Sequence, residues 1–196
     1  MESTRKLEAI DSLIPYQYEI VPSGGTCVLF FYVPYTPFVS EPGIACVDSF
    51  YVASNLAYNL AVKYAEKLNE LGIACVPNPQ MDYKAAAGGS TGKNTLLYRE
   101  GLGSRFAIGA ILLNEPLPPV SKTRYVDMPC GACDLCARAC PLGAIGEKFD
   151  RTKCMRQYML CPEQASEEIL TAFKDRILGC DICQKVCPLN RQEEQP

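Results

Sequence analysis

The clearest pattern of hydrophobic and polar positions lies between residues 50 and 71. Apolar side chains recur there every three or four positions, which predicts one long amphipathic helix. The apolar stripe consists of Ala53, Leu56, Leu60, Ala61, Tyr64, Ala65, Leu68 and Leu71. Asp48 is a suitable N-cap for this helix, and Gly72 is a suitable residue to end it.

The rest of the first 120 residues mixes helical and strand patterns. A short helix is predicted at 3–12, and apolar runs predict strands near 17–21, 27–33 and 73–76. Residues 94–98 and 105–113 flank a glycine-rich turn, which predicts a hairpin. A proline-rich stretch then ends near residue 120. It predicts an α/β domain over residues 1–120 and a second domain over residues 121–196.

Composition and charge narrow the class of protein. A hydrophobic content of 48% and a charged content of 21% are ordinary for a soluble globular chain. The longest apolar run, residues 27–33, is too short to span a bilayer, and residues 1–13 do not resemble a secretory or twin-arginine leader. We therefore expect a cytoplasmic protein with no membrane partner. The net charge of −3, without a block of basic residues, makes nucleic acid an unlikely partner.

The cysteines carry the strongest chemical signal. The chain has 12 cysteines and no histidine, which in the cytoplasm indicates metal or redox chemistry rather than disulfides. Two runs stand out, C-x2-C-x2-C-x3-C-P from Cys130 to Pro141 and C-x2-C-x3-C-P from Cys180 to Pro188. The first run is typical of proteins with two [4Fe–4S] clusters, in which the fourth cysteine binds the other cluster.

Exchange of the Cys-Pro cysteines between the two runs predicts both ligand sets. The first cluster would be held by Cys130, Cys133, Cys136 and Cys187. The second would be held by Cys140, Cys180 and Cys183 with either Cys154 or Cys161, because Ile177 occupies the position that matches Cys130. A pair of four-cysteine zinc sites is the alternative, although zinc ribbons rarely interlace in this way. Cys27, Cys46 and Cys75 are expected to be buried, inert thiols.

A glycine-rich loop at residues 88–95 is a candidate for binding a second ligand. It does not fit the phosphate-binding P-loop pattern, because Ala87 and Asn94 occupy positions that require Gly and Ser or Thr. Two interpretations remain open: a plain flexible loop, or a close approach of the backbone to a large planar ligand.

Four motifs together resemble one known family. GKNTLL (92–97), GSRFAIGAILLNEPLP (103–118), CGACDLCARACPLGAI (130–145) and GCDICQKVCPLN (179–190) are similar to the epoxyqueuosine reductases, which share their architecture with reductive dehalogenases. The resemblance implies an α+β fold, with a nitroreductase-like α/β N-terminal domain and a bacterial-ferredoxin-like module for two [4Fe–4S] clusters. It implies cobalamin as a further cofactor. In that family a basic pair precedes the cysteine between the runs, as in FDRTKCMRQY (149–158), so the resemblance selects Cys154.

The resemblance also implies the residues around the corrin ring. Those lining it would be Gly92, Lys93, Asn94, Thr95, Ser104, Phe106 and Ile108. Asp181 and Ile182 would lie between the cluster nearer to the corrin and that cofactor. The family places an acidic proton donor shortly upstream of GKNT, but residues 73–81 contain no acid. The candidate catalytic proton donors are therefore Asp82, Tyr35 and Tyr83.

The expected function is that of an iron–sulfur oxidoreductase. Single electrons from a donor such as a ferredoxin or flavodoxin would pass through the clusters to cobalamin and reduce a small-molecule substrate. Long family members carry a C-terminal helical-repeat region for tRNA, whereas this sequence ends nine residues after Cys187, which disfavours tRNA. The alternative is an electron-transfer or reductive-activator protein that docks a separate corrinoid or flavin protein.

Overall fold

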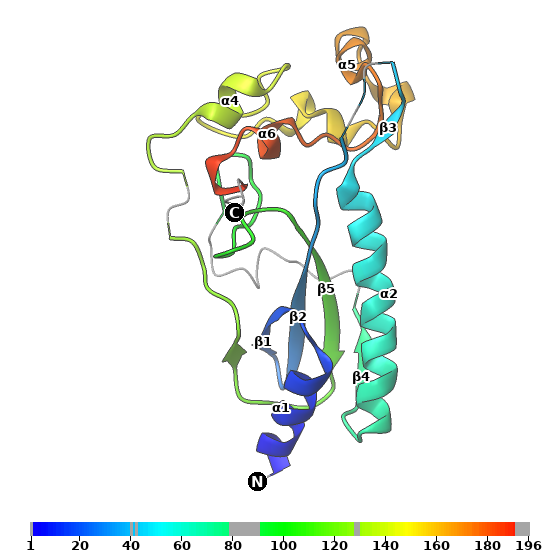
Figure 1. The fold of residues 1–196 in the computed structure, drawn as a ribbon, viewed down its shortest axis with the longest axis vertical. Helices are drawn as coiled ribbons and strands as arrows, with labels where there is room; N and C mark the ends of the chain where they lie inside the picture. Colours follow the sequence, from blue (N-terminus) through cyan, green and yellow to red (C-terminus); the bar gives the residue numbers. More distant parts are fainter. Residues whose placement is uncertain (1, 40, 42, 79–90, 128–129, 191–196) are drawn as a thin grey trace. The chain divides into compact units, whose positions relative to one another are not determined.

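The computed structural model describes residues 2–39, 41, 43–78, 91–127 and 130–190 (Figure 1). Contacts divide the chain into two compact units, each built from three segments. The first unit contains residues 1–34, 53–89 and 106–124, and the second contains residues 35–52, 90–105 and 125–196. The 90–105 segment thus belongs to the same unit as the cysteine runs. The division into separate domains at residue 120 stays a prediction.

The first unit is built on a five-stranded antiparallel sheet with the strand order β4-β5-β2-β1-β6. Its strands are β1 (Gln17–Ser23), β2 (Thr26–Pro34), β4 (Cys75–Pro77), β5 (Phe106–Leu113) and β6 (Val120–Ser121). The central strand β2 is buried at every position from 27 to 33. A strand covered on both faces is expected to be apolar throughout, which accounts for the run CVLFFYV.

Two helices, α1 (Glu2–Leu13) and α2 (Ser49–Glu70), complete the described part of this unit. In Figure 1, α2 runs alongside β4 and β5, and the Tyr64 ring on α2 meets the Phe31 ring on β2 edge-on, with 5.3 Å between centroids. The buried positions of α2 are Ser49, Ala53, Ala57, Ala61, Ala65 and Leu68. Alanine side chains at every fourth position allow the helix backbone to approach the sheet closely.

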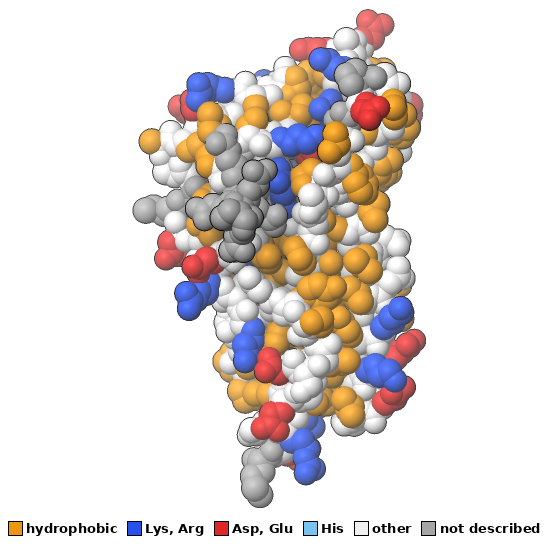
Figure 2. Space-filling model, in the orientation of Figure 1, with side chains coloured by type: hydrophobic (Ala, Val, Ile, Leu, Met, Phe, Trp, Pro, Cys, Tyr) orange, Lys and Arg blue, Asp and Glu red, His pale blue; other side chains and the backbone are white. Residues whose placement is uncertain are grey.

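The predicted apolar stripe of α2 is therefore only partly correct. Leu56 and Leu71 are 47% and 60% exposed, and Figure 2 shows hydrophobic side chains at the surface along this helix. Leu56 and Leu71 lie off the packing face, because that face follows the four-residue spacing of the buried alanines and continues to Leu68. The predicted caps are confirmed, since Asp48 Oδ1 accepts a hydrogen bond from Phe50 N at 2.9 Å and Gly72 ends the helix with φ +80°.

The alanine face gives a testable packing prediction. Replacing Ala61 with Leu is expected to destabilise the protein by about 1–3 kcal/mol, because the buried position has no room for three more carbons. Leu56→Ala, on the exposed face, should change the free energy of unfolding by no more than about 0.5 kcal/mol. Denaturant unfolding followed by circular dichroism measures both. Equal effects of the two variants would contradict the assigned packing face.

The second unit consists mainly of short elements. Strands β3 (Cys46–Val47) and β7 (Arg176–Leu178) pair in parallel, and the helices are α4 (Leu135–Ala139), α5 (Glu167–Phe173) and α6 (Ile182–Lys185). Four 3₁₀ turns accompany them: η1 (Arg151–Lys153), η2 (Met155–Gln157), η3 (Pro162–Gln164) and η4 (Pro188–Asn190). Both cysteine runs lie in this unit.

The sequence predicted the longer elements of the first unit correctly, but not the short elements of the second unit. The two helices, β1, β2 and β5 are confirmed, and the α+β class is confirmed with them. The hairpin of 94–98 with 105–113 is wrong, because β5 pairs with β2 and β4 on its two sides. Residues 91–99 instead form a turn closed by a bridge between Thr91 and Leu97. No helix in the described part of the chain is long and apolar enough to cross a membrane.

Candidate functional site

The first cysteine run folds around the short helix α4. The Cys133 amide donates to the Cys130 carbonyl at 2.7 Å, and Cys136 on α4 is only 9% exposed. Burial raises the pKa of the Cys136 thiol, and the neighbouring charges of Cys130 and Cys187 raise it further. Such a charge effect requires proximity, so Cys187 of the second run lies beside the first run.

A second group of thiols gathers around α6. Burial raises the pKa of Cys183 to about 12, and the charges of Cys180, Cys136 and Cys154 act in the same direction. Burial also raises the pKa of Cys180, with a contribution from Cys154. Cys154, which lies between the two runs in sequence, is therefore close to both Cys180 and Cys183 in space.

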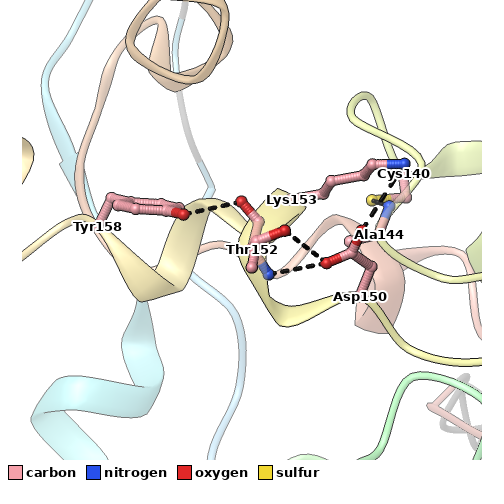
Figure 3. Close-up of polar contacts among 6 residues, drawn as sticks. All are labelled: Cys140, Ala144, Asp150, Thr152, Lys153 and Tyr158. Carbon is pink, nitrogen blue, oxygen red and sulfur yellow. Dashed lines mark hydrogen bonds and ion pairs between the residues drawn. The ribbon is translucent and has the colours of Figure 1, made fainter. Parts of the chain in front are cut away.

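The segment that carries Cys154 is held by local hydrogen bonds (Figure 3). Asp150 Oδ1 accepts from the Thr152 amide at 3.0 Å and from Thr152 Oγ1 at 2.6 Å, which caps the η1 turn directly before Cys154. These bonds from Thr152 lower the pKa of the Asp150 carboxyl. The Tyr158 hydroxyl donates to the Thr152 carbonyl at 2.9 Å. The position of Cys154 is thus fixed from both sides of the turn.

Cys140 and Cys161 have different surroundings. Cys140 ends α4, and its Sγ accepts a hydrogen bond from the Ala144 amide at 3.4 Å (Figure 3). Cys161 is half-buried and lies at the N-cap position of η3. The amide donor on Cys140 is of the kind that stabilises a thiolate.

The loop of residues 92–98, which we call the 92–98 loop, lies against the first run. The Lys93 amide donates to Cys130 Sγ at 3.2 Å, and Lys93 Nζ donates to the Cys133 carbonyl at 2.7 Å. A Cβ atom on Gly92 would lie 2.7 Å from Tyr98 Cε2, 2.8 Å from Asn94 Oδ1 and 3.2 Å from Cys130 Sγ. Glycine is needed at position 92 because the backbone passes so close to these groups.

Two buried polar side chains of the 92–98 loop also reach cysteines. The Tyr98 hydroxyl lies 3.3 Å from Cys187 Sγ, and Asn94 Nδ2 donates to the same hydroxyl at 3.1 Å. A hydrogen bond from the Asn94 side chain lowers the pKa of Cys183 against the larger effect of burial. Burial raises the pKa of Tyr98, so its hydroxyl keeps its proton. The loop therefore contacts thiols of both groups.

A buried polar network fixes α6. Gln184 Nε2 donates to the Ser104 carbonyl at 2.8 Å, and Asn190 Nδ2 donates to the Gln184 carbonyl at 2.9 Å and to Ser104 Oγ at 3.0 Å. The Ser104 amide donates to Asn190 Oδ1 at 2.7 Å. The Tyr35 hydroxyl donates to Gln184 Oε1 at 3.1 Å, and burial raises the pKa of Tyr35 to about 12. Ser104 thus positions the helix that carries Cys183.

A pocket of about 340 Å³ lies beside Asp181 and Ile182 in the second unit. Its wall includes Asp48, whose pKa is raised by burial, and Asp48 Oδ2 has no hydrogen-bond partner among the described residues. Its volume is at the small end of the range for sites that bind small molecules. The placement of Asp181 and Ile182 between a cluster and a cofactor stays a prediction.

The three remaining cysteines differ in burial. Cys27 and Cys75 are 1% and 4% exposed, as expected for inert thiols, and burial raises the pKa of Cys75 to about 11. Cys46 is only half-buried and lines the pocket beside Asp181. The expectation of a buried thiol is therefore wrong for Cys46, because this residue lines a pocket instead of packing into the core.

Other predicted site residues are distributed over the chain. Asp82 and Tyr83 lie outside the described residues. Phe106 and Ile108 lie on β5 in the first unit, where the Phe106 ring meets the Tyr32 ring edge-on, with 5.1 Å between centroids. Sequence reasoning missed three residues, Tyr98, Gln184 and Asn190. Each of them is a polar residue within or next to a motif, and this position could have drawn attention to it. The cysteine spacing alone does not point to these residues.

Thr95 carries backbone strain that can be tested. It has φ +63°, a left-handed conformation that a β-branched residue rarely adopts. Thr95→Gly is expected to increase stability by about 1 kcal/mol, because glycine adopts this conformation without strain. Thr91→Gly, at a neighbouring position with ordinary backbone geometry, should instead lose about 0.5–1 kcal/mol. Thermal unfolding measures the stability of both variants. A loss of stability in Thr95→Gly would contradict the claim that the Thr95 backbone is strained.

Comparisons with known proteins agree with this geometry. A family profile described as a 4Fe–4S double cluster binding domain matches residues 129–190. The epoxyqueuosine reductase of Shewanella oneidensis is 40% identical over 111 residues, which are 53% of this chain and 26% of that protein. The epoxyqueuosine reductase of Aliivibrio fischeri is 34% identical over 149 residues, which are 71% of this chain and 39% of that protein.

Solved structures give the same result for the fold. The epoxyqueuosine reductase of Streptococcus thermophilus superposes with a TM-score of 0.62 at 25% identity, over 87% of this chain and 50% of its own. An epoxyqueuosine reductase solved with an epoxyqueuosine-modified tRNA-Tyr stem loop gives a TM-score of 0.59 at 23% identity, over 84% of this chain and 48% of its own. The chain spans 26% and 39% of the two curated relatives above. The chain is a homologue of the epoxyqueuosine reductases over this length, and it contains a 4Fe–4S double cluster binding domain at residues 129–190.

Proposed function

We propose that the protein is an iron–sulfur oxidoreductase that passes single electrons through two [4Fe–4S] clusters to a cobalamin and reduces a bound substrate. One cluster would be held by Cys130, Cys133, Cys136 and Cys187. The other would be held by Cys140, Cys154, Cys180 and Cys183. In this proposal the first unit is the nitroreductase-like part of the family architecture.

One observation supports the ligand sets most strongly, namely that thiols of the two runs lie side by side. The charge of Cys187, in the second run, raises the pKa of Cys136 in the first run. The charge of Cys154, which lies between the runs in sequence, raises the pKa values of Cys180 and Cys183. Among the described residues, no three thiol or carboxylate side chains form a group that could hold a metal ion. A four-iron cluster binds each thiolate to a different iron, so its ligands lie farther apart than those of one zinc ion. A donor set made of thiols, in a chain without histidine, is the set that [4Fe–4S] clusters use.

The residues proposed for the corrin offer partly accessible positions. Of those in the 92–98 loop, Lys93 is exposed and Thr95 is half-buried, whereas Gly92 and Asn94 are buried. Ile108 on β5 is also half-buried. The strained Thr95 supports a functional role for this loop, since strain is retained mainly at functional sites. Cobalamin would supply a metal centre that accepts single electrons and reduces the substrate. Since the sequence contains no histidine, no imidazole of these residues could bind the cobalt.

Tyr35 is the described candidate for the proton donor. Its hydroxyl is protonated at neutral pH, and its hydrogen bond to Gln184 orients it. If Tyr35 donates a proton to the substrate, Tyr35→Phe should lower turnover at least tenfold while the iron content stays at about eight per chain. Unchanged turnover would leave Asp82 and Tyr83 as the remaining candidates.

The substrate class requires a direct comparison. The net charge of −3 disfavoured nucleic acid as a partner, but a similar protein has been solved with an epoxyqueuosine-modified tRNA stem loop. We propose to assay reduction of an epoxyqueuosine-modified stem loop and of the free modified nucleoside in parallel. Turnover of the nucleoside alone would support a small-molecule reductase. Turnover of the stem loop alone would make RNA the substrate.

The proposed function is tested by the metal content of protein purified anaerobically from cells supplied with cobalamin. About eight irons per chain are expected from two four-iron clusters, together with cobalt near one per chain. Iron without cobalt would overturn the corrinoid proposal and favour an electron-transfer or activator protein that docks a separate corrinoid or flavin protein. A zinc-loaded protein without iron would refute both.

A further inference from the structure

The 92–98 loop places two hydrogen-bond donors on thiols that are proposed to hold the same cluster. The Lys93 amide lies 3.2 Å from Cys130 Sγ, and the Tyr98 hydroxyl lies 3.3 Å from Cys187 Sγ. The two cysteines come from different runs, so the loop links both ends of one ligand set. Gly92 permits this approach, because a side chain there would meet both Tyr98 and Cys130.

We propose that the 92–98 loop sets the reduction potential of the cluster held by Cys130, Cys133, Cys136 and Cys187, with Tyr98 as the residue that tunes it. This inference rests on the ligand set of the proposed function and does not depend on cobalamin. Tyr98 is a positioning residue, because it acts on the cluster through Cys187.

The direction of the effect follows from charge. Reduction adds negative charge to a cluster and its thiolates, and a hydrogen bond to sulfur stabilises that charge. The Tyr98 hydroxyl must be the donor once Cys187 binds iron, because a ligating thiolate carries no proton. Asn94 Nδ2 donates to the same hydroxyl at 3.1 Å. Asn94 Oδ1 competes for the hydroxyl proton at 3.4 Å, which is long for a bond between two oxygens, whereas 3.3 Å is an ordinary distance from a hydroxyl to a charged sulfur. The hydrogen bond therefore shifts the reduction potential of this cluster to more positive values.

The surroundings of Tyr98 favour a strong effect. Tyr98 is 1% exposed and Asn94 is 5% exposed, so water does not compete for the hydroxyl proton. The second ligand set receives different donors, namely the Ala144 amide on Cys140 at 3.4 Å and the Asn94 side chain on Cys183. The two clusters are thus made inequivalent by side chains and loops of this chain, although their cysteine motifs are alike.

The test compares Tyr98→Phe with the unchanged protein in EPR-monitored redox titrations of the anaerobically reconstituted full chain. Tyr98→Phe should keep about eight irons per chain and shift the potential of one cluster to more negative values, leaving the other unchanged. Tyr18→Phe is the matched control, because Tyr18 is also buried, at 2% exposure, but its hydroxyl donates to the Asp11 carboxylate rather than to a thiol. Both potentials should stay unchanged in the control.

Each outcome decides the inference. Unchanged potentials in Tyr98→Phe, with full iron content, would overturn the tuning role while leaving the clusters intact. Absence of iron from the unchanged protein would instead refute the proposed function itself. If Tyr98→Phe does not retain iron, a fluorinated tyrosine introduced at position 98 replaces it. Its more acidic hydroxyl is a stronger donor and should move the potential of the same cluster in the positive direction, whereas no shift would overturn the inference.

Discussion

Replacing Cys154 with alanine is expected to reduce the iron content from about eight to about four per chain, because one four-iron cluster loses a ligand. Cys154 lies between the runs and raises the pKa of both Cys180 and Cys183, and the turn capped by Asp150 holds it in place. The cluster held by Cys130, Cys133, Cys136 and Cys187 should persist. Iron analysis and the EPR signal of the reduced protein measure the loss.

Cys161→Ala is the matched control for this prediction. Cys161 also lies between the two runs and is half-buried, like Cys154. The variant should retain about eight irons per chain, since Cys161 is not needed as a ligand. The opposite result, with iron lost from Cys161→Ala and retained in Cys154→Ala, would transfer the eighth ligand to Cys161 and refute the choice that the family resemblance suggested.

Replacing Gly103 with alanine is expected to destabilise the protein by about 2–5 kcal/mol, the sum of backbone strain and steric overlap. Gly103 has φ +59°, and a Cβ atom there would overlap with Asn190 Oδ1 and with the Leu189 carbonyl oxygen, and would lie 3.1 Å from the Leu189 carbonyl carbon. Relief would require the backbone at Leu189 to move, which would break the bonds of Asn190 to Ser104 and to α6. Thermal unfolding and iron retention measure the effect.

Gly143→Ala is the control that separates the cost of backbone strain from the cost of steric overlap at Gly103. Gly143 has φ +62°, nearly the same backbone conformation, but a Cβ atom added there would have no other atom within 4 Å. The variant should therefore lose only about 1–2 kcal/mol, the cost of a left-handed alanine. If the two variants were equally stable, the close packing of Gly103 against the Cys-Pro segment of the second run would be refuted.

These predictions share one physical basis. The second unit contains few long elements, so hydrogen bonds and close backbone packing hold its cysteines in place. Gln184 and Asn190 flank the Cys-Pro segment of the second run and are buried with Ser104. Buried polar groups that are fully hydrogen-bonded specify one arrangement, because any slip leaves them unpaired. The positions of the ligands, and with them the properties of the clusters, depend on this network.

The sequence by itself determined the features that local patterns encode. Cysteine spacing is set by how many residues a chain needs to wrap around a cluster, so two runs ending in Cys-Pro predict a double-cluster domain. Apolar periodicity likewise predicted α2, β1, β2 and β5, because each pattern reflects burial on one face or on both.

Only the tertiary structure decided which residues surround the cysteines. The contacts of Tyr98 with Cys187 and of Ser104 with Asn190 join residues more than eighty positions apart, and no local pattern encodes such a distance. The same holds for β5, whose pairing with β2 and β4 replaced the predicted hairpin because two neighbouring strands satisfy both of its edges. The glycine at position 92, which the sequence left open, is explained by its approach to Cys130 and Tyr98, a contact that exists only in the folded chain.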